Sequence, residues 1–130
     1  MIKEIKKHKD KLYFIFRVLV GFLFFQHGAQ KLFGWFGAQG TVPLFTLFGL
    51  AGLIELVGGL LILIGLFTKI VASITALEML VAYFMAHASK GLIPIINGGE
   101  LSLLYLAAFL VIVRYGGKVW AVENILIKKK

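Results

Sequence analysis

The sequence of 130 residues contains no cysteine, and this absence restricts the chemistry that the chain can perform alone. Without a thiol it cannot form a disulfide, a cysteine-ligated iron–sulfur centre or a cysteine nucleophile. Any redox reaction would therefore need a quinone, another cofactor or a partner protein to carry the electrons.

Charged residues are also scarce, at 15% of the chain against about a quarter in an average soluble domain, whereas hydrophobic residues make up 60%. A run of about 20 mostly apolar residues can cross a hydrocarbon core of about 30 Å as a helix. Four such runs lie near residues 12–33, 48–67, 70–88 and 100–116. We therefore expect an all-α fold, a polytopic integral membrane four-helix bundle in the cell membrane, with a single transmembrane domain over residues 1–130.

Acidic residues are fewer than basic ones, which gives a formal net charge of +8. Most Lys and Arg residues precede the first apolar run, lie between the second and third or follow the last, and only Lys31 and Lys90 fall on the opposite side. By the positive-inside rule both termini are expected to be cytoplasmic, where the basic ends would contact anionic lipid. The basic residues form no stripe with interleaved aromatics, so nucleic acid is not an expected partner.

The first run is longer than a signal-peptide core and no A-x-A-like site follows it, so we expect a retained helix.

Polar side chains interrupt the stretch "FFQHGAQKLFGWF" at residues 24–36. With helices of alternating direction and about 1.5 Å of rise per residue, several separated polar groups fall at one depth near the outer face. They are Gln26, His27, Gln30, Lys31, Glu55, His87, Asn97 and Glu100. Ionisable groups in a membrane pair with one another or face a cavity, so the group forms either a structural network or an outward-facing pocket for a small polar or aromatic molecule.

Particular partners can be proposed for the charged residues. Lys31 is expected to pair with Glu55 or Glu100. From the inner side, Arg17 is expected to reach toward Glu78, which lies near the middle of the third run.

Two histidines on different helices, His27 and His87, are the minimum for a bis-histidine haem. Neither belongs to a motif with ligand spacing, so haem or metal is not expected.

Glycine spacing and capping patterns predict local structure. Gly21 and Gly28 in the first run, and glycines of the second run, form small-residue stripes that mark helix packing faces. Thr68 is expected to cap the third helix, and Asn97 with Glu100 has capping-box spacing. Residues 34–49 are expected to form a short interfacial helix or an early start of the second helix, since Pro43 suits a first turn.

Several motifs together resemble the DoxX family. They are Arg17, "HGAQKLFGWFG" at 27–37, Glu55 with "VGGLLILIGLFTK" at 57–69, and "NGGELSLLYL" at 97–106. The resemblance implies a small four-helix membrane protein, similar to a membrane subunit of thiosulfate:quinone oxidoreductase or to relatives associated with quinone and catechol stress. Some relatives are associated with membrane oxidoreductase complexes. No inference follows for the C-terminal segment 115–130.

The resulting hypothesis is an oxidoreductase subunit that binds a quinone-like headgroup, with His27 and Glu55 as the catalytic groups that exchange protons. The expected ligand-binding residues are Arg17, Gln26, Gln30, Lys31, Glu78, His87, Asn97 and Glu100. Redox partner proteins would supply electrons, and no stripe specifies a dimer. The alternative is a non-enzymatic scaffold or a carrier of a small solute or lipid, in which the same polar groups are structural.

Overall fold

The computed structural model describes residues 1–128, and within that part of the chain the regular elements are all helical. The all-α prediction is therefore confirmed. The elements are α1 (Ile2–Phe33), α2 (Leu47–Ile64), α3 (Thr68–Ala86), the 3-10 turn η1 (Ala88–Lys90), α4 (Pro94–Asn97), α5 (Glu100–Tyr115) and α6 (Val122–Lys128).

Three helical segments are long and apolar enough to cross a membrane: α1, α2 and the segment Thr68–Lys90 that joins α3 to η1. The fourth predicted span corresponds to α5, which has 16 residues. At about 1.5 Å per residue α5 is shorter than a hydrocarbon core of about 30 Å. Length and composition thus support a multi-pass membrane protein with three candidate spans.

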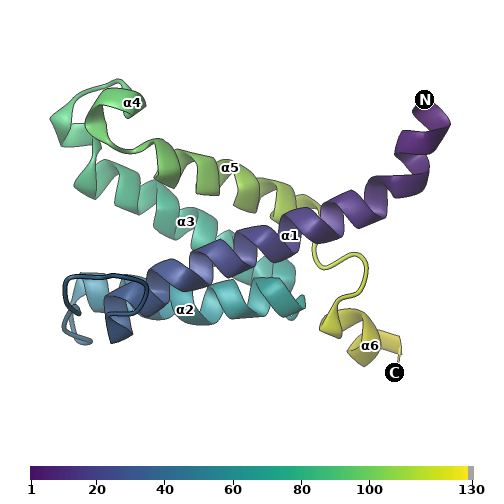
Figure 1. Ribbon diagram of the computed structural model, residues 1–130, viewed down its shortest axis with the longest axis horizontal. Helices are drawn as coiled ribbons and strands as arrows, with labels where there is room; N and C mark the ends of the chain where they lie inside the picture. The colour runs from purple at the N-terminus through teal and green to yellow at the C-terminus, as the bar shows by residue number, and fades with distance from the viewer. Residues whose placement is uncertain (129–130) are drawn as a thin grey trace.

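The long helices form two pairs (Figure 1). α1 packs along α2, and α5 packs along α3. The pairs lie together near the turn between α2 and α3 and diverge toward the end that carries α4. The N-terminal part of α1 projects beyond the bundle at the end where the α2–α3 turn and α6 also lie.

The α1–α2 contact is close because glycines lie on both helices. Gly21 faces the backbone of Gly59 and Leu63, and Gly28 faces the backbone of Leu56 and Gly52. The prediction that the glycine stripes mark packing faces is confirmed, as expected for helices that associate in lipid through close backbone approach.

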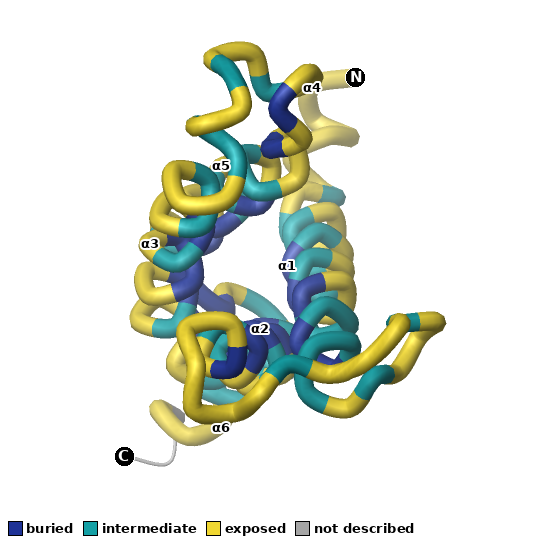
Figure 2. Tube along the Cα trace, turned by 90° about the vertical axis from the view of Figure 1, so that its left-hand side faces the viewer, coloured by how far each residue is buried: buried dark blue, intermediate teal, exposed yellow. Residues whose placement is uncertain are grey.

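The buried faces of the four longer helices are turned toward the interior of the molecule (Figure 2). Phe24 of α1 packs edge to face on Phe109 of α5, with ring centroids 4.7 Å apart. Ile62, Ala72 and Ile112 are fully buried in the same core. Many large apolar side chains on the outer faces are exposed, which suits contact with lipid.

Helices α2 and α3 begin close to the predicted residues 48 and 70, but the helix expected before α2 and the expected Thr68 cap are wrong. Residues 34–46 form turns rather than a helix, because the loop folds back on α1 through the N–H of Val42, which donates to the Lys31 carbonyl at 2.8 Å. Helix α2 begins at Leu47, and the Thr46 hydroxyl accepts from the Gly49 N–H at 3.1 Å. In α3, Thr68 is the first helical residue and not the cap.

The predicted capping box at the start of α5 is also wrong. Asn97 ends α4, and Gly98 then adopts a left-handed conformation with φ of 79° that separates α4 from α5. Gly99 is the N-cap, and its N–H donates to Asn97 Oδ1 at 2.8 Å. Glu100 is the first residue of α5, where a carboxylate favours the positive end of the helix dipole.

Candidate functional site

An ion pair joins the first two helices. Lys31 Nζ of α1 lies 2.5 Å from Glu55 Oε1 of α2, with the lysine side chain 32% exposed and the glutamate side chain 4% exposed. The predicted pairing of Lys31 is therefore confirmed with Glu55. Its alternative partner, Glu100, is exposed at the start of α5.

A second carboxyl group, that of Glu78 on α3, lies beside this pair. Glu78 lies near enough to Glu55 for the two carboxyl groups to interact electrostatically. Both oxygens of Glu78 and Oε2 of Glu55 are buried, and no N–H or O–H donor within residues 1–128 reaches them.

His27 and an aromatic wall complete the arrangement. His27 precedes Lys31 by one helical turn on α1 and lies within electrostatic range of Glu55. Its ring packs edge to face on Tyr105 of α5, with centroids 5.7 Å apart. We refer to His27, Lys31, Glu55 and Glu78 as the polar cluster. It draws on three helices, and Tyr105 contributes from a fourth.

Arg17 does not reach toward Glu78, so that prediction is wrong. The guanidinium is fully buried and donates from Nη1 to the carbonyls of Ile62 at 2.7 Å and Leu63 at 2.9 Å. Nη2 reaches the carbonyls of Val119 and Trp120 at 3.3 and 3.4 Å. The last carbonyls of a helix lack intrahelical donors, and a cation there also favours the dipole. The carbonyl groups left unpaired at the end of α2 therefore account for the position of the Arg17 guanidinium.

Glu123 of α6 is an important residue that the sequence analysis did not identify. Its Oε2 accepts from the Thr68 N–H at 2.9 Å, and its Oε1 accepts from the Gly117 N–H at 2.7 Å. The carboxylate thus caps the free N-terminus of α3 and holds the C-terminal segment against it. No local sequence signal reveals this role, because the two partners are 55 and 6 residues away.

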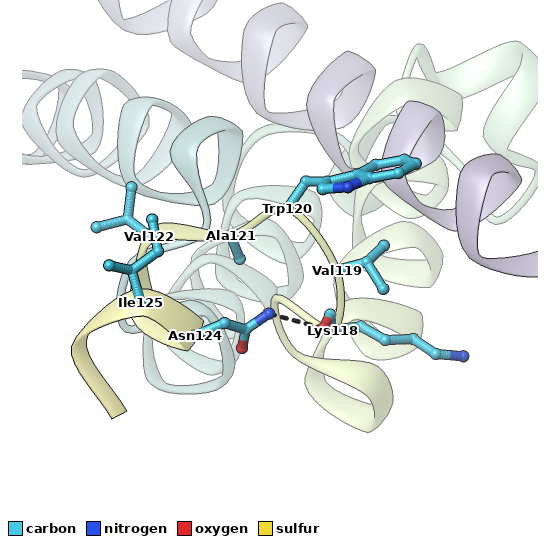
Figure 3. A pocket seen from close by; sticks show the side chains of 7 residues that line it. All are labelled: Lys118, Val119, Trp120, Ala121, Val122, Asn124 and Ile125. Atoms are coloured by element: carbon cyan, nitrogen blue, oxygen red, sulfur yellow. Dashed lines mark hydrogen bonds between the residues drawn. The ribbon is translucent and has the colours of Figure 1, made fainter. Parts of the chain in front are cut away.

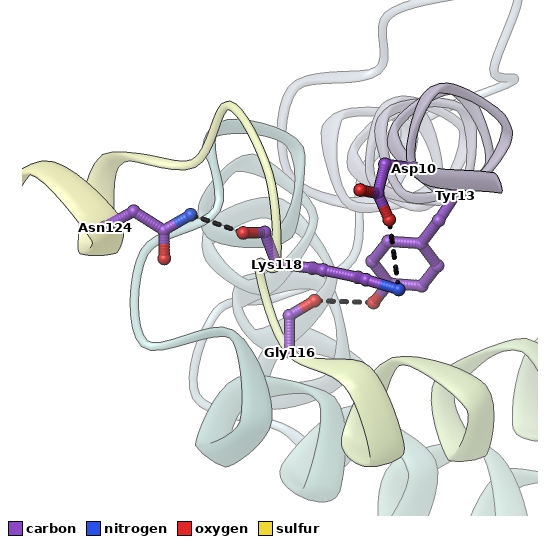
Figure 4. A network of polar contacts seen from close by, with 5 residues as sticks. All are labelled: Asp10, Tyr13, Gly116, Lys118 and Asn124. Carbon is purple, nitrogen blue, oxygen red and sulfur yellow. Dashed lines mark hydrogen bonds and ion pairs between the residues drawn. The ribbon is translucent and has the colours of Figure 1, made fainter. Parts of the chain in front are cut away.

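The same end of the molecule carries a further network between the N-terminal and C-terminal segments (Figure 4). The Tyr13 hydroxyl donates to the Gly116 carbonyl at 2.5 Å, and Lys118 pairs with Asp10 at 3.1 Å. Asn124 donates to the Lys118 carbonyl at 2.7 Å. These contacts stabilise the packing of both terminal segments at the α2–α3 turn.

Other predicted ligand-binding residues are bonded in the loops at the opposite end. Asn97 Nδ2 donates to the Tyr83 hydroxyl at 3.0 Å and to the Gly91 carbonyl at 2.9 Å. His87 Nδ1 lies 3.3 Å from the Asn97 carbonyl, and Gln30 donates to the Phe36 carbonyl at 3.1 Å. These residues hold the η1–α4 loop and the loop after α1, and none of their recorded bonds is with the polar cluster.

The surface of residues 1–128 includes two hollows that bear on the site. The first, of ≈ 480 Å³, lies around residues 118–125 beside Trp120 and Ile125 (Figure 3). The second, of ≈ 320 Å³, is an apolar groove between α2 and α3. Neither of these two hollows is lined by a member of the polar cluster. Over residues 1–128, no group of three or more His, Asp or Glu side chains is placed to hold a metal ion.

Comparisons with known proteins agree with this description. The DoxX family profile matches residues 12–88. A Haemophilus influenzae protein described only as "uncharacterized protein" is 38% identical, over 98% of this chain and 100% of its own length. A Bacillus subtilis protein named "putative oxidoreductase CatD" is 30% identical, over 89% of this chain and 87% of its own. No solved structure matches the chain.

Proposed function

Because the chain belongs to the DoxX family, we propose that it is an integral membrane subunit of an oxidoreductase system and that its polar cluster binds a quinone-like or other small redox molecule. The Bacillus subtilis relative supports a redox role through its name. The four residues of the polar cluster have numbers within the range 12–88 that the family profile matches, which supports the proposal.

The observation that carries the proposal is the set of buried acceptors without donors. Glu55 is 3% exposed, and within residues 1–128 its Oε2 has no protein donor, like both oxygens of Glu78. Ionisable groups are expensive within a membrane and are retained mainly at functional sites. Buried carboxylate oxygens that lack a protein donor can accept the proton of a bound hydroxyl group.

Each residue of the polar cluster would have a separate role in the oxidation of a bound quinol. On oxidation of a quinol to a quinone, two protons leave the hydroxyl groups and two electrons leave the ring. Glu55 and Glu78 would take up protons, and His27 would pass them toward the loop end of the bundle. Lys31 would hold Glu55 in place and stabilise anionic character on the ligand. A partner protein of the redox system would accept the electrons.

We also propose a four-helix arrangement in the membrane with both termini on the cytoplasmic side. The antiparallel packing of α5 on α3 supports a four-helix bundle in the cell membrane. The excess of basic residues at the end that carries both termini supports their placement on the cytoplasmic side. The polar cluster would then lie toward the outer leaflet.

A structural role is the second candidate, favoured by one specific observation. The Lys31–Glu55 pair connects α1 to α2, and neither hollow reaches it. In that case the protein would be a non-enzymatic scaffold or a carrier of a small solute or lipid.

Binding of a reduced quinone analogue to purified protein in nanodiscs separates the two candidates. Glu78→Gln keeps the size of the side chain and can still donate to Glu55, but it cannot accept a proton. We expect it to weaken quinol binding by about tenfold or more, since a hydrogen bond to a charged group contributes about 1.5 to 3 kcal/mol.

Glu100→Gln is the matched control, because Glu100 is exposed and outside the polar cluster. We expect its affinity to equal that of the unmodified chain. Equal affinities for all three proteins, or no binding by any of them, would favour the structural role. Mass spectrometry of molecules that co-purify with the protein would give an independent readout.

A further inference from the structure

Two loops at the end of the bundle opposite the chain termini expose large apolar side chains. The first loop, residues 34–46, joins α1 to α2, and the second, residues 91–99, contains α4; both lie at the same end of the molecule (Figure 1). Phe45 in the first loop is 98% exposed and Leu92 in the second is 93% exposed. Exposed apolar patches of this kind bind a membrane or another protein.

The exposed side chains of the two loops form what we call the apolar loop surface, which consists of Trp35, Leu44, Phe45, Leu92, Ile95 and Ile96. No charged residue occurs in residues 32–54 or in residues 91–99. The surface therefore offers no ionic contact to a partner, and any binding to it depends on apolar side chains.

The first loop lies close to the hydrocarbon boundary, because it is bonded to α1 before that helix ends. The Val42 N–H donates to the Lys31 carbonyl at 2.8 Å, two residues before the last residue of α1, Phe33. The apolar part of α1, residues 12–33, is about 33 Å long at about 1.5 Å of rise per residue, close to a hydrocarbon core of about 30 Å. Phe45 follows Val42 by three residues, and α2 begins at Leu47. The loop thus cannot stand far out in water.

The second loop is bonded to α3 in a similar way. Asn97 Nδ2 donates to the hydroxyl of Tyr83 at 3.0 Å, and Tyr83 belongs to the last turn of α3, which ends at Ala86. The apolar segment Thr68–Lys90 is about 35 Å long at about 1.5 Å of rise per residue. The second loop therefore also lies near the boundary of the hydrocarbon core.

The backbone of the first loop sets the opposite limit on its depth. Of the N–H groups in residues 35–45, those of Ala38 and Val42 donate to backbone carbonyls. The others need water or headgroup oxygens, since irregular backbone that faces lipid does not occur within the hydrocarbon region. The backbone is thus expected at headgroup level, with the apolar side chains directed at the acyl chains.

We infer that the apolar loop surface binds the lipid of one leaflet at the boundary between headgroups and acyl chains, and that it anchors the loop end of both helix pairs there. Interfacial segments bury their apolar side chains to about 5–10 Å at this boundary. The surface also continues the exposed apolar sides of α1 and α2, where Phe33, Leu47 and Phe48 lie. Because the surface has no charge, this binding does not depend on lipid charge or on a ligand at the polar cluster.

The absence of cysteine allows a direct test, because one introduced cysteine carries a nitroxide label at a single site. Phe45→Cys and Leu92→Cys label the apolar loop surface, and Gln39→Cys, at an exposed polar position in the first loop, is the matched control. Lys3→Cys on the projecting part of α1 gives a reference for water, and Leu77→Cys on the exposed side of α3 gives one for lipid. In phosphatidylcholine nanodiscs, collisions of each label with oxygen are compared with collisions with a water-soluble nickel chelate.

We expect the oxygen-to-nickel collision ratios at Phe45 and Leu92 to lie closer to that at Leu77 than to that at Lys3. The ratio at Gln39 should be lower than that at Phe45. Replacing phosphatidylcholine by phosphatidylglycerol should leave the ratios at Phe45 and Leu92 unchanged, since residues 32–54 and 91–99 are uncharged.

A second measurement leaves the apolar loop surface unmodified. The chain has two tryptophans, so Trp120→Phe makes Trp35 the only one. We expect lipid brominated on its acyl chains to quench the fluorescence of Trp35, and iodide in the water phase to quench it much less. This measurement applies even if a cysteine variant of the loops fails to fold.

Three results would overturn the inference. Collision ratios at Phe45 and Leu92 equal to that at Lys3 would show that the loops stand in water, as a surface for a soluble partner would. Low collision rates with both reagents would show that protein, such as a second copy of the chain, covers the labels. Quenching of Trp35 by iodide but not by brominated lipid would refute the contact of the first loop with acyl chains.

Discussion

Replacing Gly28 by alanine should separate the two helices that carry the Lys31–Glu55 pair. The added Cβ would stand 2.6 Å from the Leu56 Cα and 2.7 Å from the Gly52 carbonyl oxygen, and it would also meet the Leu56 nitrogen. Carbon contacts are favourable at about 3.5 to 4.0 Å, so the axes must part locally by about 1 Å. Backbone atoms cannot rotate away as the end of a side chain would.

The magnitude follows from two opposing effects. Overpacking costs about 1 to 3 kcal/mol, whereas alanine has a helix propensity better than that of glycine by about 1 kcal/mol. Because every close contact of the new Cβ is with backbone, we expect the upper part of the first range. The net loss of unfolding free energy should be about 1 to 2 kcal/mol.

Reversible unfolding in mixed micelles, followed by tryptophan fluorescence, measures this loss. Gly40→Ala is the control, since its Cβ would meet nothing within 4 Å and Gly40 has no positive φ. It should change stability by less than about 0.5 kcal/mol. If Gly28→Ala is as stable as Gly40→Ala, then the close contact of α1 and α2 derived from the structure is incorrect.

Two further predictions concern the end that carries both termini. Arg17→Lys keeps the charge, but one ammonium group cannot donate to carbonyls on two segments. The same unfolding experiment should therefore show a loss of about 2 to 3 kcal/mol in the free energy of unfolding. A change below about 0.5 kcal/mol would contradict the assigned hydrogen bonds. Glu123→Ala removes the acceptor for the N–H groups of Thr68 and Gly117, so trypsin should cleave after Lys118 faster than in the unmodified chain. Unchanged cleavage would show that the carboxylate does not hold the segment.

Some contacts between distant residues can be predicted from the sequence, because leaving the residues without those contacts would cost much free energy. An unpaired charge in hydrocarbon costs several kcal/mol. The sequence therefore predicts that Lys31 pairs with a carboxylate at a similar depth, and Glu55 is one of the two candidates. Glycines repeated along one helix face likewise have few uses in a membrane apart from close packing. The structure confirms both predictions.

Helix starts were less accessible, because several local patterns fit the same short segment. Thr68 and Asn97 both have the chemistry of a cap, yet Thr68 opens its helix and Asn97 closes one. The true cap of α3 is a carboxylate that arrives from α6. A signal that depends on a residue 55 positions away cannot be found in a local window.

The sequence by itself determined that the chain is helical and lies in a membrane. Hydrophobic content is a sum over residues, and a backbone surrounded by lipid must satisfy its own hydrogen bonds within each helix. Only the tertiary structure decided which polar groups meet. Arg17 lies at the open carbonyls of α2 and Glu78 lies beside Glu55, because the rotation and crossing of packed helices select one partner among several at the same depth.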